Sequence, residues 1–294
     1  HPMSHGTGIA AHGRQYVVEP EDAAHTTLRC FTRGKKSDLV CGDRVEIQPS
    51  GDGQGVVERI AERHSLLYRS NEFREKLIAA NVTQVLIVVA TEPSFSDELI
   101  TRCLLACESQ DIAPLIVLNK CDLADRLPAA RAALAPFTAL GYPLLELSAK
   151  GATSDLAALR ARLAGHTSVL VGQSGMGKST LTNALVPHAQ AATREISTAL
   201  DSGKHTTTHA TLYRLDDSSA LIDSPGLQEF GLGHLDATAL EHAFPELRTR
   251  LGECRFRDCR HDREPGCAVR AALDAGAIDA RRYAVFRSLR DALR

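Results

Sequence analysis

Gly172-Gln173-Ser174-Gly175-Met176-Gly177-Lys178-Ser179 is the stretch of this sequence that decides its fold. It fits the pattern G-x-x-x-x-G-K-[ST] and lies between an apolar run at 168–171 and a helical pattern that begins near Lys178. In such a loop, glycines let backbone N–H groups curl around a β-phosphate. Lys178 would supply charge to the phosphate oxygens and serve catalysis, and the Ser179 hydroxyl would ligate Mg²⁺. The context favours a P-loop nucleotide site, with Thr180 beside it, over a glycine-rich turn without a ligand.

Apolar segments of strand length alternate with helical patterns on both sides of this loop. Continuous apolar strands separated by helices indicate a parallel sheet that is covered on both faces. We therefore expect an α/β domain over residues 75–244. Its strands are expected at 82–90, 115–118, 144–147, 168–171 and 220–222, and its helices at 97–109, 126–140, 154–163 and 178–185.

The two flanking regions have different patterns. Between residues 15 and 68, short β-type runs alternate with turn signals, which predicts a small β-barrel in a first domain at 1–74. After Pro245 an arginine-rich, cysteine-bearing tail follows, with helical character from Val269 onward, and we assign it to a third domain at 245–294. We expect His1 and Pro2 to be a cloning remnant before a native start at Met3.

A second phosphate-side element, Asp223-Ser-Pro-Gly226, closes an apolar strand and fits the pattern D-x-x-G. The Asp223 carboxylate would hold a Mg²⁺-bound water, and the Gly226 N–H would contact a γ-phosphate. A D-x-x-G sequence alone is a common turn. Its position about fifty residues after the P-loop makes the nucleotide-binding interpretation the stronger one.

Two further elements predict which base is bound. Asn119-Lys120-Cys121-Asp122 fits N-K-x-D, and Ser148-Ala149-Lys150 fits the companion element whose backbone N–H meets guanine O6. The Asp122 carboxylate can accept two hydrogen bonds from guanine N1–H and the 2-amino group, and adenine offers no such pair. Asn119 would brace the loop, and the stem of Lys120 would lie over the ring. An ordinary polar loop is the alternative for N-K-x-D taken alone.

The order of these elements differs from that of Ras-like GTPases, in which the P-loop comes first. Here residues 119–122 and 148–150 precede the P-loop, and the D-x-x-G element follows it. This order indicates circular permutation, which compact domains tolerate when their termini lie close together.

With these motifs, the segment Gly203-Lys-His-Thr-Thr-Thr208 and the Cys/His tail, nearly the whole chain resembles the circularly permuted, small-ribosomal-subunit-dependent GTPases known as RsgA or YjeQ. The resemblance implies a multi-domain α/β protein: an N-terminal OB-type β-barrel, a central circularly permuted P-loop GTPase domain and a C-terminal zinc-binding helical module. It also implies GTP hydrolysis that is stimulated by the small (30S) ribosomal subunit and its rRNA, in late maturation of that subunit.

The catalytic group differs from that of Ras-like enzymes. Ras-like enzymes place a glutamine directly after D-x-x-G, whereas this chain has Leu227, which cannot orient water. The resemblance points instead to His205, with Gln228 as a weaker rival and a solvated loop histidine as the alternative. Among Thr206, Thr207 and Thr208 we favour Thr207 as a Mg²⁺ ligand, although the sequence does not fix which one.

The tail contains a candidate structural zinc site, made by Cys254, Cys259, His261 and Cys267. Three thiolates and one imidazole form a closed tetrahedral Zn²⁺ site, and the spacing agrees with the resemblance. A chance cluster of reduced thiols is the alternative. We interpret the other five cysteines as core or neutral residues.

Composition limits the remaining possibilities. The chain of 294 residues is 44% hydrophobic and 24% charged, and it has no apolar run long enough for a membrane span, so we expect a cytoplasmic monomer. The formal net charge of −2 hides a division, because residues 75–244 carry 12 basic and 18 acidic side chains and residues 245–294 carry 12 and 8. RNA contact through the flanking domains therefore stays open. A basic group around one barrel loop supports it, or forms only a solvated face: Arg29, Arg33, Lys35, Lys36 and Arg44.

Two other functions compete with a GTP hydrolase. Leu227 allows a non-hydrolysing, guanine-nucleotide-dependent RNA-binding module, and the cysteine cluster beside a P-loop allows a zinc-containing ATPase. Asp122 argues against the ATPase.

Overall fold

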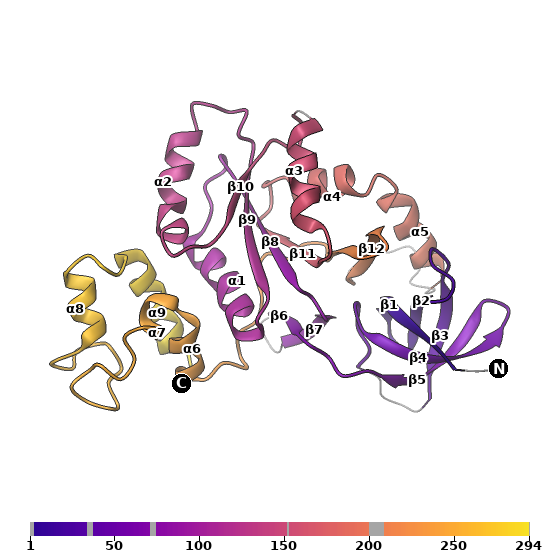
Figure 1. Ribbon diagram of the computed structural model, residues 1–294, viewed down its shortest axis with the longest axis horizontal. Coiled ribbons are helices and arrows are strands. Elements are labelled where there is room, and N and C mark those ends of the chain that lie inside the picture. The colour runs from indigo at the N-terminus through magenta and orange to yellow at the C-terminus, as the bar shows by residue number, and fades with distance from the viewer. Residues whose placement is uncertain (1–2, 34–37, 71–74, 152, 200–208, 294) are drawn as a thin grey trace.

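The molecule is an elongated arrangement of a barrel, a central sheet and a helical module, in that order along the chain (Figure 1). The computed structural model describes residues 3–33, 38–70, 75–151, 153–199 and 209–293. Among these residues, no helix combines the length and the apolar character needed to cross a bilayer. The barrel and the helical module lie at opposite ends, with the central sheet and its helices between them.

The N-terminal barrel is closed, with the strand order β1-β2-β3-β5-β4. Inward side chains that alternate along the strands, such as Tyr16, Val18, Val45 and Ile47, form its core. The β3 and β5 strands pair in parallel, and the other neighbours are antiparallel. The predicted barrel is confirmed, with a first strand that the sequence patterns did not indicate. The strands are β1 (Ser4–His12), β2 (Gln15–Pro20), β3 (Leu28–Thr32), β4 (Arg44–Gly51) and β5 (Gln54–Ile60).

A separate two-stranded sheet connects the barrel to the central sheet. It consists of β6 (Leu66–Ser70) and β7 (Glu75–Ala80), which pair antiparallel. Ala79 also bridges to Cys41, next to the barrel. The predicted boundary at residue 74 falls between these two strands, and the three domain ranges stay predictions.

The central sheet has six strands in the order β10-β9-β8-β11-β13-β12. The five strands from β10 to β13 are parallel to one another, and β12 at the edge is antiparallel to β13. The predicted parallel sheet is therefore confirmed, with an antiparallel edge strand added. The strands are β8 (Gln84–Ala90), β9 (Ala113–Asn119), β10 (Leu144–Glu146), β11 (Thr167–Gly172), β12 (Thr211–Asp216) and β13 (Ser219–Asp223).

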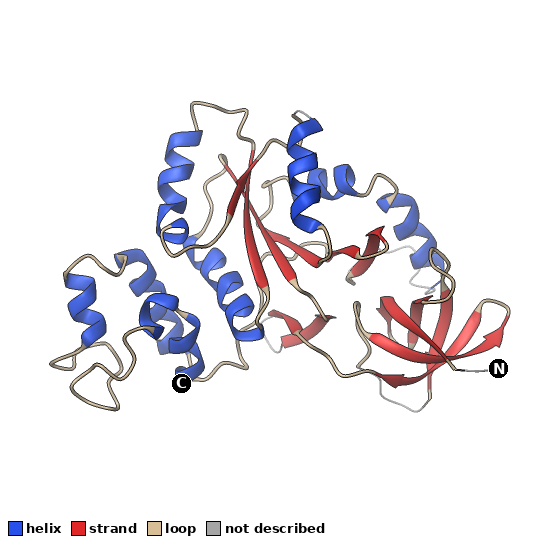
Figure 2. Ribbon diagram, viewed as in Figure 1, coloured by secondary structure: helices blue, strands red, loops and turns tan. Residues whose placement is uncertain are grey.

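Helices cover both faces of this sheet (Figure 2). Alternate residues of β8 pack into two different cores because successive side chains point to opposite faces of a strand. Ile87 packs in one core with residues of α1 and α2, and Val88 packs in the other with residues of α3 and α4. The helices are α1 (Asp97–Gln110), α2 (Leu127–Thr138), α3 (Thr153–Leu163) and α4 (Lys178–Leu185), followed by α5 (Ala189–Ala199), which the sequence patterns did not indicate.

The C-terminal module packs its helices against α1 and shares the core of that face. Within the module, Arg282 Nε and Nη2 each donate to the buried Glu246 carboxylate at 2.9 Å, and Arg282 Nη1 reaches across to Thr101 Oγ1 of α1 at 3.4 Å. The guanidinium also lies over the rings of Phe244 and Phe137. The module is therefore fixed to the sheet domain. Its helices are α6 (Ala237–Ala243), α7 (Pro245–Arg248), α8 (Ala268–Asp274) and α9 (Ala280–Ala292).

Candidate nucleotide-binding and metal sites

Four of the predicted elements border one cavity of about 730 Å³ at the carboxyl ends of the parallel strands. They follow β9, β10, β11 and β13, and ligands of open α/β sheets bind at this edge. The volume is within the range of small-molecule sites. The predicted residues that line it are Asn119, Lys120, Asp122, Ser148, Ala149, Lys150, Gly172, Gln173, Ser174, Gly175, Gly177, Lys178, Ser179, Thr180 and Gly226.

Asn119 joins three of these loops. Its Oδ1 accepts from the N–H of Lys120 at 2.8 Å and of Ala149 at 2.9 Å, and its Nδ2 donates to the Met176 carbonyl at 3.1 Å. The side chain is buried, and each of these three hydrogen bonds goes to the protein backbone. Asn119 therefore fixes the N-K-x-D loop, the S-A-K loop and the P-loop relative to one another.

Lys120 and Asp122 have different surroundings in the N-K-x-D loop. The Lys120 ammonium donates to the Gly175 carbonyl at 2.8 Å and to the Glu92 carbonyl at 2.9 Å, which ties it to the P-loop. Asp122 lines the cavity and is exposed there. Its carboxylate is thus available to accept hydrogen bonds from a ligand.

Two glycines of the P-loop are required by their surroundings. Gly177 has a φ of 90°, and a Cβ there would lie 2.2 Å from Asn119 Nδ2. A Cβ on Gly172 would lie 2.7 Å from the Val88 carbonyl oxygen. Any other residue would force the loop away from the sheet, so the glycines keep the backbone where its N–H groups reach a phosphate.

Lys178, at the start of α4, is held by the D-x-x-G turn. Its ammonium donates to the Ser224 carbonyl at 2.8 Å and lies 3.7 Å from Asp223 Oδ1. Burial lowers the pKa of Lys178, the nearby Arg69 adds to that effect, and Asp223 opposes it. Asp223 Oδ1 is buried and has no hydrogen-bond partner among the described residues. An unsatisfied carboxylate oxygen at this position fits a water held by Mg²⁺.

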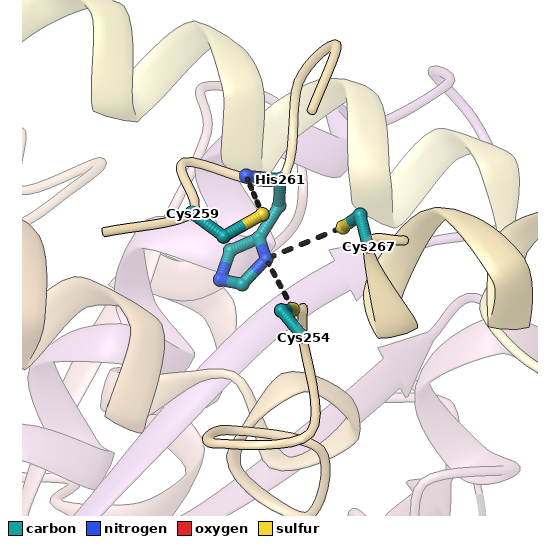
Figure 3. A group of neighbouring side chains, drawn as sticks. All are labelled: Cys254, Cys259, His261 and Cys267. Atoms are coloured by element: carbon teal, nitrogen blue, oxygen red, sulfur yellow. Dashed lines mark hydrogen bonds between the residues drawn. The ribbon is translucent and has the colours of Figure 1, made fainter. Parts of the chain in front are cut away.

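The three cysteines and one histidine of the tail form a second site (Figure 3). Their ligand atoms all lie within 4.8 Å of one another, and His261 Nδ1 is 3.6 Å from Cys254 Sγ and 3.5 Å from Cys267 Sγ. Backbone N–H groups of His261, Ala268 and Arg270 point at the sulfurs. A compact Cys₃His set with such donors fits a tetrahedral Zn²⁺ ion.

The loop that carries these ligands is fixed by its own side chains. The Glu264 carboxylate accepts from the N–H groups of Arg260, Asp262 and Arg263. These hydrogen bonds, that of Arg260 above all, lower the pKa of Glu264 to about 2. The ligands therefore come from a loop that its own hydrogen bonds hold together.

Comparison with known proteins decides the family. The model of the RsgA GTPase family matches residues 60–233, which is more than half of the chain. The chain belongs to the RsgA GTPase family. This result confirms the resemblance that the motifs indicated.

Similar members of the RsgA family come from Burkholderia and Ralstonia. The chain is 56% identical over 285 residues to the "Small ribosomal subunit biogenesis GTPase RsgA" of Burkholderia pseudomallei strain K96243, with 97% of this chain and 90% of that protein covered. It is 53% identical over 290 residues to the protein of the same name from Ralstonia nicotianae, with 97% and 91% covered.

Solved structures of RsgA relatives have the same fold. YjeQ from Thermotoga maritima matches with a TM-score of 0.75 and 30% identity, covering 99% of both chains. YloQ, described as a circularly permuted GTPase, matches with a TM-score of 0.75 and 28% identity, covering 100% of this chain and 96% of that one. The permuted order predicted from the motifs is therefore confirmed.

Some predicted residues of this RsgA-family chain do not line the cavity. Met176 packs its side chain into the core and offers the site only its backbone. Asp223 does not line the cavity, and its Oδ1 lies 3.7 Å from Lys178 Nζ. His205 and Thr207, with the rest of 200–208, lie outside the described residues, so their roles stay predictions.

The residues after the D-x-x-G turn explain the missing glutamine of this RsgA-family chain. The Leu227 side chain is buried in the main core, and its carbonyl accepts from the Gly172 N–H at 3.1 Å. Leu227 thus holds the first residue of the P-loop through its backbone, while Gln228 is exposed and lines the cavity.

Three contributors to these sites carry no signal in the sequence. Asp155 accepts from the Ser148 N–H at 3.0 Å, and Arg69 binds the D-x-x-G turn. Glu241 Oε1 lies 3.3 Å from His261 Nε2, which leaves Nδ1 toward the thiols. Arg69 and Ser224 are 155 positions apart, so only the fold brings them together, whereas Asp155 is seven positions from Ser148 but outside the S-A-K pattern.

Proposed function

We propose that this protein hydrolyses GTP, that the small ribosomal subunit stimulates the reaction, and that the protein acts in late maturation of that subunit. The observation that carries the proposal is the single cavity to which both guanine-type and phosphate-type elements contribute. The names of the RsgA relatives, which refer to small-subunit biogenesis and GTPase activity, support it. A cytoplasmic monomer is the form that we propose for this role.

The residues divide into a base side and a phosphate side. Asp122 would accept from guanine N1–H and the 2-amino group, and Ala149 would turn its N–H from Asn119 Oδ1 to O6. The P-loop N–H groups would surround the β-phosphate, and Lys178 would leave the Ser224 carbonyl to reach the β- and γ-oxygens. The remaining proposed contacts come from Asn119, Lys120, Ser148, Lys150, Thr180 and the 172–179 loop as a whole.

Ser179 and Thr207 are the proposed Mg²⁺ ligands, with Asp223 holding a water of the ion. When bound, Mg²⁺ would neutralise developing charge on the phosphate oxygens. His205 is the proposed residue that orients the attacking water, since Leu227 is buried in the core. We therefore expect slow intrinsic turnover that the small subunit raises.

One structural Zn²⁺ would be held by Cys254, Cys259, His261 and Cys267. All four positions of a tetrahedral ion would be filled by protein, so this metal would support the fold and leave hydrolysis to the other site.

Contact with rRNA is proposed through the two flanking domains. On the barrel, Arg33 pairs with Glu58 at 2.8 Å and Arg44 pairs with Glu21 at 3.1 Å, so part of the basic group is already neutralised. The C-terminal module has the larger excess of basic side chains, which makes it the stronger candidate for phosphate contacts. Association with the small subunit should weaken as salt rises.

Phosphate release from GTP and from ATP, each with and without purified small subunits, tests the proposed function. We expect hydrolysis of GTP only, with a large stimulation by subunits. Absence of turnover with subunits would favour the non-hydrolysing RNA-binding module, and turnover of ATP would favour an ATPase.

The substitution Asp122→Asn tests the base assignment. An amide cannot accept both guanine donors, so GTP affinity should fall by about 10³-fold, while xanthosine triphosphate, which has a carbonyl in place of the 2-amino group, should bind better than it does to wild type. Asp125→Asn, a nearby carboxylate that does not line the cavity, is the control and should leave both affinities unchanged. Equal weakening of both nucleotides by Asp122→Asn would contradict the assignment.

A further inference from the structure

Arg69 connects the β6–β7 hairpin to the D-x-x-G turn. Its Nη2 donates to Ser224 Oγ at 2.6 Å and to the Pro225 carbonyl at 2.9 Å. The backbone of β6 holds the next segment as well, because the Gly231 N–H donates to the Tyr68 carbonyl and Arg69 bridges to Phe230. Both the main chain and the side chain of β6 thus hold the turn and the segment that follows it.

The bond to Pro225 has a geometric consequence for Gly226. The Pro225 carbonyl and the Gly226 N–H belong to one planar trans peptide unit, so they point in opposite directions. Gly226 lines the nucleotide cavity, whereas Arg69 is not among the described residues that line it. An arginine that holds the carbonyl on the outer side of the turn therefore turns the N–H toward the cavity.

Packing does not fix this peptide unit. Gly226 has a φ of 72°, and a Cβ there would meet no described atom within 4 Å. Hydrogen bonds must therefore set its orientation. The Leu227 N–H closes the turn on the Ser224 carbonyl at 3.1 Å, and two cationic side chains make the other bonds, since Lys178 binds the Ser224 carbonyl and Arg69 binds the Ser224 hydroxyl and the Pro225 carbonyl. A nucleotide that draws Lys178 to its phosphates would leave Arg69 as the remaining cationic anchor.

We infer that Arg69 is a positioning residue that directs the Gly226 N–H at the γ-phosphate and so raises the affinity of this site for GTP relative to GDP. The inference rests on the proposed function, in which Gly226 meets the γ-phosphate. It also gives the β6–β7 hairpin a role in reading the nucleotide. The hairpin follows Arg63, whose guanidinium binds the buried Asp43 carboxylate of the barrel through two bonds of 2.8 Å.

The test compares two affinities in three variants of the full chain. Dissociation constants for GDP and for a non-hydrolysable GTP analogue are measured by calorimetry for wild type, Arg69→Ala and Arg69→Lys. We expect Arg69→Ala to weaken the GTP analogue by about 10-fold, as for one hydrogen bond to a charged group, and to leave GDP within about twofold. Arg69→Lys should recover part of the loss, because one terminal nitrogen makes both bonds but the lysine chain is shorter.

Unchanged GDP binding shows that a variant is folded, and Arg59→Ala is the matched control. Arg59 is an exposed arginine of β5 that pairs with Glu46 at 2.9 Å, and its loss should move neither affinity. Equal weakening of both nucleotides by Arg69→Ala, or no weakening of the GTP analogue, would overturn the inference while leaving the proposed function intact. A wild-type protein that binds neither guanine nucleotide would overturn both.

Discussion

The nucleotide cavity and the Cys₃His cluster collect polar side chains in opposite ways. The cavity takes its residues from loops spread between positions 119 and 228, and it leaves Asp122 exposed and an oxygen of Asp223 without a partner among the described residues. The cluster takes four ligands from the segment 254–267 and buries three of them. A site that must exchange its ligand needs unsatisfied groups and an opening, whereas a site that supports the fold can satisfy every group and close.

Removing one ligand of the closed cluster should have the largest effect. Cys259→Ala leaves three ligands, so we expect zinc to fall from one per chain to a trace. The free energy of unfolding of the C-terminal module should drop by about 5 kcal/mol or more, since structural zinc contributes about 10–16 kcal/mol in small peptides. GDP affinity should stay within about threefold, because the cavity takes no residue from the module. Metal analysis by mass spectrometry and thermal unfolding measure the two effects.

Cys107→Ala is the control for the zinc prediction. Cys107 is a buried thiol of α1 and is not part of the cluster, so its loss should leave zinc binding intact and cost roughly 1–2 kcal/mol as a small cavity. One zinc per chain retained in Cys259→Ala would contradict the assignment of the cluster.

The same contrast explains what the sequence could reveal. The P-loop, N-K-x-D and Cys₃His residues are close together in the chain, and their chemistry requires fixed spacings, so their patterns are readable without the fold. Arg69 meets Ser224 across 155 positions, and nothing near either residue in sequence indicates the other. Those side chains could not be predicted because a contact between distant segments depends on how the elements pack.

Strand prediction failed for a related reason. The buried strands β8 and β9 are continuous apolar runs, and the sequence indicates both. By contrast, β1 is rich in glycine and alanine, which have low strand propensity, and a Cβ on Gly6 would lie 2.7 Å from Val18 Cγ1. The edge strand β12 has a polar, partly exposed second half. These strands form because they pair with neighbouring strands of the fold, β1 with β2 and β4, and β12 with β13.

The buried ion pair of the C-terminal module, whose guanidinium also contacts α1 and α2, should show the second-largest effect. Glu246→Gln would leave the Arg282 guanidinium buried without its counter-charge, and breaking such a pair costs about 3–5 kcal/mol. Urea unfolding measures the loss. The neighbouring Arg281 pairs with Asp97 at 3.2 Å but is 46% exposed, so Arg281→Gln should cost less than about 1 kcal/mol. Equal costs for the two substitutions would show that burial of the pair at Glu246 does not matter.

The junction at the other end of the sheet should respond to pH, with a smaller effect. Here His209, just before β12, faces His12 of the barrel with ring centroids 6.1 Å apart. Burial lowers the pKa of His209 below its ordinary value of 6.5, and the nearby His12 and Lys76 lower it further. The unfolded chain therefore binds a proton at His209 before the folded chain does.

This difference makes the barrel end less stable in acid. The contribution of neutral His209 is fully present above about pH 6.5 and is lost as the pH falls from 6.5 toward the folded-state pKa. The loss should stay below about 1.4 kcal/mol, the free energy of one pKa unit, because His209 is only half-buried and solvent screens its charge. Unfolding free energies at pH 7.5 and 5.5 measure it. The unfolding free energy of His209→Gln should decrease less than that of wild type over this interval. The decrease for His12→Gln should lie between the two, since this substitution removes one of the two neighbouring charges. If the unfolding free energy of His209→Gln decreases as much as that of wild type, the acid sensitivity lies elsewhere than at the barrel junction.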